Sequence, residues 1–344
     1  MDLEEARTLK RQLVGYVDEL LATRARPATA PAGGDARGVG AAVASLAPVG
    51  VALGLAPRGD GGVDIALRYT LGTPTARMVA RRLAGEVGPG LDVRRTGRIR
   101  PLASGSPRPP VATAQATGET GRVRPLRPGV SIAHYAVSAG TLGAFVTLTG
   151  GTGVHALSNF HVLAGSPDAR VGDDVLQPGS ADGGRLPEDR VGALAAWVPV
   201  APGAPLAVDA AVAALDDPVV EAVYPGGPLA GPAPATGEEE VEKIGRTTGV
   251  TRGRVTALEL DGVVVDYGPG IGDLQFDNQI EVEAAGPEPF SRGGDSGALV
   301  YRPSDRRAIG LLFAGSETGG ENGTGLTYVN PIAEVLTALG ATLV

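Results

Sequence analysis

Cysteine is absent from the 344 residues, which excludes disulfide bonds, thiolate catalysis and cysteine-based zinc sites. Aromatic side chains are also scarce, at 4% of the chain, so an apolar core must be built from Val, Leu, Ala and Ile. No uninterrupted apolar run reaches the roughly 18 residues that a membrane-spanning helix needs, and the acidic start, MDLEEARTLKRQL, lacks the apolar segment of a secretion signal. We therefore expect a cytoplasmic protein without a membrane partner.

Lysine is nearly absent as well, because only Lys10 and Lys243 occur among the 30 basic residues, an arginine bias that indicates a GC-rich, bacterial genome. The net charge of −8 provides no basic footprint for a nucleic-acid partner. The acidic turns VGDDV and SADGG lack the spacing of an EF-hand, and turn chemistry accounts for them. We expect no metal and no other cofactor.

Glycine and proline, with 53 and 28 residues, are abundant and unevenly spread, as expected for turn-rich β-structure joined by linkers. Residues 1–25 predict an amphipathic helix, because apolar residues recur there at three- and four-residue steps between charges. Such an apolar stripe must be covered either by the body of the same chain or by something else. The second alternative is a homo-oligomer or a partner protein bound through this helix.

The remaining sequence divides into three segments. Residues 38–99 predict a small α+β domain with a helix over 74–88 and a closing strand over 91–99. Residues 100–127 are rich in proline and small polar residues, which predicts an extended or disordered linker. Residues 128–344 contain short Val-, Leu- and Ala-rich runs punctuated by Gly, Pro and Asp, which is typical of a β-barrel or sandwich.

The last helical pattern, NPIAEVLTALGA, begins at Asn330. Asparagine is a favourable N-cap, proline fits the first turn and glycine fits the end of a helix. We therefore expect Asn330 to cap a helix that starts at Pro331 and ends at Gly340.

Only three histidines are present, so a general base for a serine nucleophile is easily sought. His161 lies in HALSNFHVLAG, Asp209 in the apolar run LAVDAAVAAL, and Ser296 in FSRGGDSGALVY. A buried carboxylate needs a hydrogen-bonding partner, and a catalytic imidazole would be one. The chain order His, Asp, Ser is that of chymotrypsin-type enzymes. Taken singly, the histidine and the glycine-rich turn could both be structural, and His134 and His155 are expected to be so.

These segments resemble those of trypsin-like serine proteases. LSNFHVLAG resembles the histidine segment, VDAAVAAL the aspartate segment and GDSGALV the serine segment. PGVSIAHYAVSAGTLGAFV, VLQPGSADGG, KIGRTTGVTRGRV and IGLLFAGS further resemble the narrow-leaf-type branch, which has plant members and bacterial relatives. The resemblance covers about residues 126–344 and extends weakly to 38–99. It implies a mainly β fold, a chymotrypsin-like double β-barrel, preceded by the N-terminal helix and the small α+β domain.

The resemblance also implies roles for individual residues. Ser296 would be the nucleophile, His161 the general base and then acid, and Asp209 the group that orients His161. The backbone N–H groups of Gly294 and Ser296 would form the oxyanion hole. Asp295 would point away from the substrate and anchor the loop, paired with Arg292 or another cation.

The substrate-binding residues implied by position are Phe290, Phe313, Ala314 and Gly315. Phe290 lies six residues before the serine, where the base of the primary pocket is expected. Because it is not acidic, specificity for Arg or Lys is disfavoured, and an apolar or small residue before the scissile bond is expected.

The sequence thus predicts a hydrolase, a serine endopeptidase that acts on protein or peptide substrates through an acyl-enzyme. Two alternatives stay open: a non-catalytic protease-fold module that binds peptides or partner proteins, and a self-processing regulator that cuts its own 100–128 segment. The catalytic prediction requires Ser296 Oγ about 2.6–3.2 Å from His161 Nε2, or somewhat farther in an unliganded site.

Overall fold

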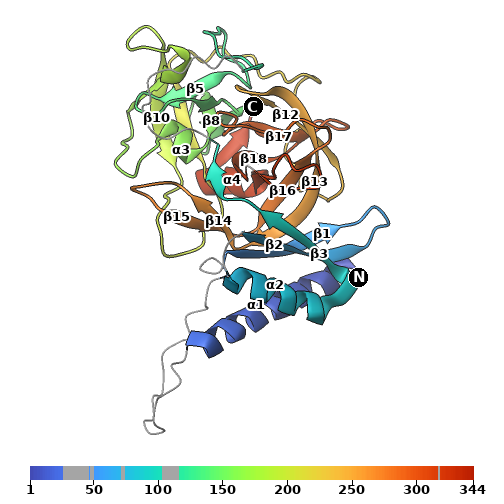
Figure 1. Ribbon diagram of the computed structural model, residues 1–344. Helices are drawn as coiled ribbons and strands as arrows, with labels where there is room; N and C mark the ends of the chain where they lie inside the picture. Colours follow the sequence, from blue (N-terminus) through green and yellow to red (C-terminus); the bar gives the residue numbers. More distant parts are fainter. Residues whose placement is uncertain (26–45, 47–49, 71–73, 103–115, 317) are drawn as a thin grey trace.

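The computed structural model of the chain describes residues 1–25, 46, 50–70, 74–102, 116–316 and 318–344, and it is mainly β (Figure 1). Two β-barrels form the upper body of the molecule in this view, and a layer of strands and helices from the N-terminal region lies below them. None of the helices in these ranges has the length and apolar character required to cross a membrane.

The C-terminal barrel is closed by six antiparallel strands, because β12 pairs with both β17 and β13 at the two ends of the strand order. Its interior is filled by aliphatic side chains and Phe290. The barrel strands in pairing order are β12 (Glu240–Gly245), β17 (Leu299–Arg302), β18 (Arg307–Ser316), β19 (Thr327–Pro331), β16 (Gln279–Ala284) and β13 (Gly249–Asp261).

The N-terminal barrel is a half-open sheet around Phe145, Phe160 and aliphatic residues. Its strands in pairing order are β20 (Ala341–Leu343), β7 (Ala144–Leu148), β8 (His155–Ser158), β11 (Ala211–Leu215), β10 (Arg190–Trp197), β9 (Asp174–Leu176), β5 (Ser131–His134) and β6 (Gly140–Thr141). Outside the two barrels lie the hairpin β14 (Val263–Asp266) and β15 (Asp273–Phe276), the helices α3 (Phe160–Leu163) and α4 (Ile332–Leu339), and the 3₁₀ turn η3 (Ser180–Asp182). A closed barrel beside a half-barrel confirms the predicted chymotrypsin-like double β-barrel.

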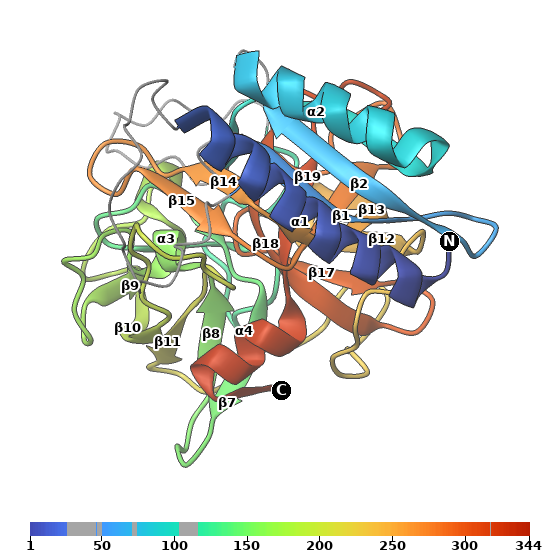
Figure 2. The ribbon, with the colours of Figure 1, turned by 90° about the horizontal axis from the view of Figure 1, so that it is seen from below.

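The N-terminal layer has three main strands with two helices on the face that points away from the barrels (Figure 2). Buried Ala6, Leu13 and Val17 of the first helix pack on this sheet, so the apolar stripe of the helix is covered by its own chain. The elements are α1 (Leu3–Ala25), β1 (Val51–Pro57), β2 (Val63–Thr70), α2 (Pro74–Val87), η2 (Gly88–Gly90), β3 (Leu91–Thr96) and β4 (Ile99–Pro101). A homo-oligomer or partner complex through α1 stays a prediction.

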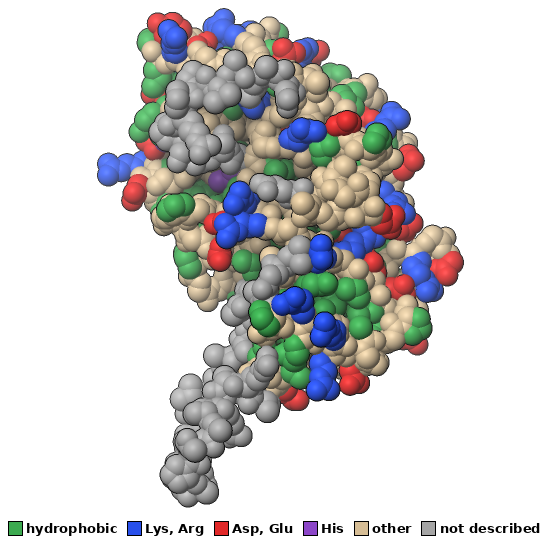
Figure 3. Space-filling view, in the orientation of Figure 1, with side chains coloured by type: hydrophobic (Ala, Val, Ile, Leu, Met, Phe, Trp, Pro, Cys, Tyr) green, Lys and Arg blue, Asp and Glu red, His purple; other side chains and the backbone are tan. Residues whose placement is uncertain are grey.

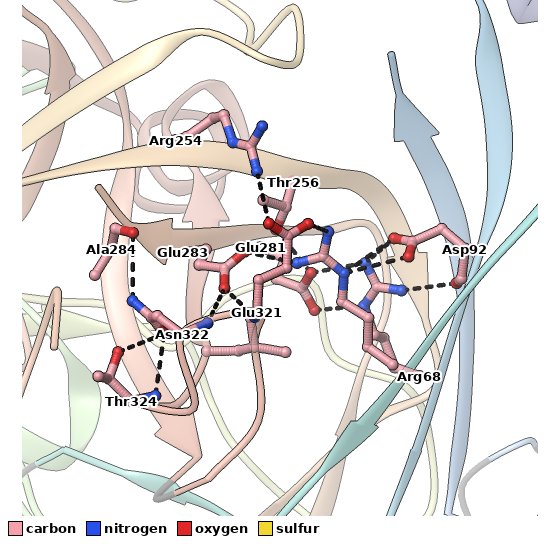
Figure 4. Close-up of polar contacts among 12 residues, drawn as sticks. Arg68, Asp92, Arg254, Thr256, Glu281, Glu283, Ala284, Glu321, Asn322 and Thr324 are labelled. Carbon is pink, nitrogen blue, oxygen red and sulfur yellow. Dashed lines mark hydrogen bonds and ion pairs between the residues drawn. The ribbon is translucent and has the colours of Figure 1, made fainter. Parts of the chain in front are cut away.

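The N-terminal layer is joined to the C-terminal barrel by shared strands and buried charges. Strand β1 pairs antiparallel with β13, so one continuous sheet crosses the boundary. Figure 4 shows the ion-pair network beside it, in which Arg68, 2% exposed, donates to the fully buried Glu281 at 2.7 Å. Arg94 binds Glu283 at 2.8 Å. Burial lowers the pKa of Arg68, but the charges of Glu281 and Asp92 raise it by more, so the buried arginine stays charged and paired. The domain boundaries themselves stay a prediction.

The closing strand predicted over 91–99 is wrong in its extent. Strand β3 ends at Thr96, and the chain then turns at Gly97, whose N–H donates to Thr318 O at 3.2 Å. Residues Ile99–Pro101 leave the N-terminal layer and form β4, which pairs with β18 of the C-terminal barrel. The end of the predicted α+β domain and the start of the predicted linker therefore lie against the barrel.

The rest of the predicted linker is described from residue 116 onward, and residues 103–115 lie outside the described part. Thr117 N–H donates to Thr247 O at 2.8 Å, and Leu126 is 5% exposed in the core of the N-terminal barrel. Where it is described, this segment is therefore held against the barrels.

A hollow of about 500 Å³ lies on the outer surface of α2, where Figure 3 shows apolar side chains between basic ones in the lower part of the molecule. Arginines cannot serve as general bases at neutral pH, and methionine and proline offer no nucleophile. The hollow therefore has no catalytic constellation. Its lining residues are Pro74, Arg77, Met78, Arg81 and Arg82.

Candidate active site

The structure brings His161 and Asp209 into contact beside the N-terminal barrel. His161 lies in α3, and Asp209 lies two residues before β11. The imidazole Nδ1 contacts Asp209 Oδ2, and the backbone N–H of His161 donates to Asp209 Oδ1 at 3.4 Å. The two side chains are 7% and 0% exposed. With the carboxylate at Nδ1, the proton of the neutral ring belongs on Nδ1, which leaves Nε2 as the free base.

Asp209 is held by side chains that the sequence prediction missed. Its backbone carbonyl accepts from Asn159 Nδ2 at 2.7 Å, and its backbone N–H donates to Asn330 Oδ1 at 3.0 Å. Asn330 Nδ2 in turn donates to Gln279 Oε1 at 2.7 Å. The predicted N-cap role of Asn330 is therefore wrong: Pro331 occupies the cap position, and the Asn330 amide is used to fix Asp209.

Tyr267, which follows β14, is a second missed residue. Its hydroxyl donates to Asp209 Oδ2, the oxygen that also contacts His161, and its ring meets the imidazole edge-on with centroids 5.9 Å apart. Burial, with the Asp209 charge as a second cause, raises the pKa of Tyr267 well above its usual value. The tyrosine therefore stays protonated and serves Asp209 as a donor. No spacing in the sequence links residues 209 and 267, so this contact had no local signal.

Ser296 lies in a buried turn whose shape requires glycine. Gly294 and Gly297 have φ of +99° and +89°, in the left-handed region that disfavours side chains. A Cβ at Gly297 would also overlap the hydroxyl of Ser158, which lies three residues before His161. Thr141 N–H donates to Ser296 O at 2.7 Å, so the serine turn is hydrogen-bonded to strand β6 of the N-terminal barrel.

Ser296 Oγ donates to Phe313 O at 3.3 Å. His161 Nε2 is buried and has no hydrogen-bond partner among the described residues. The predicted Ser296–His161 hydrogen bond is therefore absent, because the serine hydroxyl is turned toward a backbone carbonyl. The structure joins two members of the predicted triad and places the third in the adjoining turn, and the three catalytic roles stay predictions.

Asp295 points away from the Ser296 hydroxyl, as predicted for a loop anchor. Its fully buried carboxylate accepts from the backbone N–H groups of Thr247 and Arg292, both at 2.9 Å. The ion-pair partner is Lys243, also fully buried, with Nζ 3.3 Å from Asp295 Oδ2. Burial lowers the pKa of Lys243, and the Asp295 charge opposes this shift.

The Arg292 side chain does not fill the role suggested for it. Its guanidinium pairs with Glu288 at 3.2 Å on the surface. The alternative prediction, another cation, describes what the structure shows. Lys243 is one of only two lysines in the sequence. It lies 52 residues from Asp295, so no local pattern indicated that the two would pair.

Of the predicted substrate-binding residues, Phe313, Ala314 and Gly315 lie on β18, and Phe290 lies in the apolar cluster of the C-terminal barrel. Phe313 O accepts from Leu102 N at 3.3 Å, while the Phe313 ring packs in the core against Phe276, with centroids 4.8 Å apart. Ala314 and Gly315 pair with Pro101 and Arg100 of β4. Phe313 therefore contacts Leu102 through its backbone. We call the edge of β18 at residues 313–316, beside the Ser296 turn, the candidate cleft.

Leu102 lies at the end of this pairing. It packs against the apolar cluster that contains Phe290, which is 3% exposed. A Cβ at Gly315 would lie 3.1 Å from Leu102 Cδ1, so glycine leaves the space that the leucine occupies. The backbone carbonyl of Leu102 accepts from Gly294 N–H. A peptide carbonyl thus occupies the place predicted for an oxyanion hole.

No family model matches the chain, and no curated protein matches it. Among solved structures, it is similar to Thermobifida fusca Protease A, with 19% identity over 64% of this chain and 99% of that chain and a TM-score of 0.44. It is also similar to a glutamic acid-specific serine protease (24% identity, 64% and 100% covered, TM-score 0.43) and to Cellulomonas bogoriensis chymotrypsin (23%, 64% and 99%, 0.41). The three are described as a protease, a glutamic acid-specific serine protease and a chymotrypsin. The narrow-leaf-type branch stays a prediction.

Proposed function

We propose that the chain is a serine endopeptidase with Ser296 as nucleophile, His161 as base and Asp209 as the positioning carboxylate. One observation carries the proposal: the buried His161–Asp209 pair adjoins a serine turn whose Gly294 N–H already binds a peptide carbonyl. A serine, a histidine held by an acid and a donor for the oxyanion are the parts that acyl transfer requires.

Catalysis requires the Ser296 hydroxyl to turn from Phe313 O toward His161 Nε2. A buried nitrogen without a hydrogen-bond partner costs about 1–3 kcal/mol. Rotation of the Ser296 hydroxyl would therefore give His161 Nε2 the partner that it lacks among the described residues. Ser296 Oγ then attacks the substrate carbonyl carbon while its proton moves to Nε2. The Nε2 proton passes to the leaving amine, and a water activated by His161 hydrolyses the acyl-enzyme.

Gly294 N–H stabilises the oxyanion in this scheme, and Ser296 N–H is the second donor. One such donor contributes about 2.7–4 kcal/mol to transition-state stabilisation. The Asp295–Lys243 pair holds both N–H donors in position, because it fixes the loop that carries them.

The proposed substrate is an extended peptide that pairs with Ala314–Ser316 and places an apolar side chain beside Phe290. Strand addition supplies backbone hydrogen bonds, and the pocket supplies side-chain selectivity. Phe290 is part of an apolar cluster, so the preference for an apolar residue before the scissile bond follows from burial.

The competing function is a non-catalytic module that binds peptides in the same cleft. The orientation of Ser296 Oγ toward Phe313 O favours it, because the hydroxyl is not activated in that position. The two functions share the peptide-binding edge and differ in whether Ser296 is reactive.

Labelling with a fluorophosphonate probe separates these functions. Leu102 packs against the apolar cluster of Phe290, so the assay includes Leu102→Asp, whose carboxylate is disfavoured in that cluster. The control is Leu186→Asp, a matched change at a 42% exposed leucine. We expect the probe on Ser296, found by peptide mapping, with faster labelling in Leu102→Asp and none in Ser296→Ala. If folded Leu102→Asp protein stays unlabelled, the binding module is the correct function.

A further inference from the structure

Residues 99–102 lie along β18 in the position where a substrate would lie. The pairing is antiparallel, with Pro101 opposite Ala314, Arg100 opposite Gly315 and Ile99 opposite Ser316. Antiparallel addition to a free sheet edge is a common mode of peptide recognition. The chain therefore fills its own candidate substrate cleft.

The pairing ends at Leu102 with the contacts that a scissile residue needs. Leu102 N–H and Ser296 Oγ both donate to Phe313 O, each at 3.3 Å, so one acceptor holds the residue and the nucleophile side by side. The Leu102 carbonyl accepts from Gly294 N–H, the proposed oxyanion donor. The carbonyl of a cleaved bond must occupy that place.

The side chains of the segment also match their surroundings. Leu102 enters the apolar cluster of Phe290, as described above. Arg98 and Arg100 lie 3.3 and 3.9 Å from the Asp266 carboxylate, the residue next to Tyr267. The segment is thus matched by burial at Leu102 and by charge at Arg98 and Arg100, which favours specific seating over a chance contact.

The N-terminal layer delivers the segment to the cleft. It is anchored to the C-terminal barrel by the β1–β13 pairing, by Arg68–Glu281 and by Lys10, whose Nζ lies 2.7 Å from Asp261 Oδ2. Gly97, two residues before the segment, donates its N–H to Thr318 O. Tethering makes binding intramolecular and raises the effective concentration of the segment at the cleft.

We propose that the peptide bond between Leu102 and Ala103 is this protease's own substrate and is cut within the same molecule. The proposal rests on the proposed function, and names one substrate for that site. It narrows self-processing to one bond, at one end of the 100–128 segment.

The reaction balances as peptide hydrolysis. Ser296 Oγ bonds to the Leu102 carbonyl carbon and transfers its proton to His161 Nε2. The bond from that carbon to the Ala103 nitrogen breaks, and the nitrogen takes the proton and leaves as an amine. Water then attacks the acyl carbon and gives a proton to His161, which returns it to Ser296 Oγ as the Leu102 carboxyl group is released.

Because the anchors of the N-terminal layer do not involve the cut bond, fragment 1–102 should stay bound to fragment 103–344. Its new carboxyl terminus would remain at Gly294 N–H as a product in the cleft. Removal of that fragment would then be required before other substrates enter.

Intact-mass spectrometry of the purified full chain tests the proposal. We expect wild type to convert to fragments 1–102 and 103–344, which co-elute in native size exclusion and separate in denaturant. Ser296→Ala should stay at full mass, as should Leu102→Asp, whereas Leu186→Asp should be cut like wild type. The fraction cut against time should be unchanged by dilution, and Ser296→Ala mixed with wild type should remain whole.

Each other result overturns the proposal in a recognisable way. A full-length wild type whose Ser296 is labelled in Leu102→Asp shows that the endopeptidase stands and self-cleavage does not occur. Cleavage of Ser296→Ala in the mixture shows an intermolecular reaction, and a cut at another bond shows that the seating of Leu102 is not productive. A full-length wild type together with an unlabelled Leu102→Asp removes both the protease and its self-cleavage.

Discussion

Lys243→Met removes the ammonium group that pairs with Asp295 and leaves a carboxylate without a counter-charge in the barrel interior. Both side chains are fully buried, with Nζ and Oδ2 3.3 Å apart. Breaking a buried pair by removal of one partner costs about 3–5 kcal/mol. The hydrogen bonds to Asp295 from Thr247, Thr248 and Arg292 remain. We therefore expect a loss near the lower value, about 3 kcal/mol.

Urea denaturation measures this loss, with Ser296→Ala as the parent so that self-cleavage cannot interfere. For a slope of about 3 kcal/mol per molar urea, the midpoint should fall by about 1 M. The double variant Lys243→Met, Asp295→Asn should recover at least half of the loss, because a neutral amide needs no counter-charge. Lys10→Met is the matched control: its partner Asp261 is 32% exposed and can be solvated by water, so the cost should be smaller than for Lys243→Met.

Two outcomes refute this reasoning. If Lys243→Met is within about 0.5 kcal/mol of its parent, the charge pair does not hold the Asp295 loop. If the double variant is no more stable than the single one, the lost stability comes from packing of the lysine stem, not from the stranded carboxylate.

Three further predictions concern buried tyrosines and the glycine that follows Ser296. Tyr267→Phe removes a donor to the Asp209 carboxylate, worth about 1.5–3 kcal/mol, so steady-state kinetics on a peptide should show kcat reduced about 10- to 100-fold with KM little changed; an unchanged kcat contradicts the positioning role. Gly297→Ala in the Ser296→Ala parent should cost more in urea denaturation than Gly150→Ala, because both have positive φ but only Gly297 also meets another side chain; equal costs would show that the clash is relieved. Burial raises the pKa of four tyrosines in the folded protein, namely Tyr224, Tyr267, Tyr301 and Tyr328. The unfolded state therefore loses these protons first, so the free energy of unfolding should fall as pH rises above about 10. Ultraviolet titration should show that the four tyrosines ionise only on unfolding.

Local patterns were sufficient for much of the fold. The helical periodicity of residues 1–25 and 74–88 corresponds to α1 and α2, because an amphipathic helix is specified by side chains three and four positions apart. The glycines around Ser296 predicted a sharp turn, and positive φ at Gly294 and Gly297 shows why no other residue fits. The scarcity of histidine directed attention to His161, which contacts Asp209.

Errors arose where a residue's partner was distant in sequence. Asn330 has the composition of an N-cap, but its amide is taken by Asp209, 121 residues away. The run 91–99 has the composition of one strand, but its end pairs with β18 of the C-terminal barrel. Local propensity is a weak preference, and a hydrogen bond to a buried group outweighs it.

The sequence alone determined the element types, the absence of disulfide and thiolate chemistry, and the identity of a histidine, an aspartate and a serine in chymotrypsin-type order, because these depend on residue type and near-neighbour spacing. Only the tertiary structure decided that Lys243 holds Asp295, that Tyr267 serves Asp209, and that Leu102 lies in the cleft with its carbonyl at Gly294. Such contacts depend on barrel closure and strand register, which join residues that no local pattern relates.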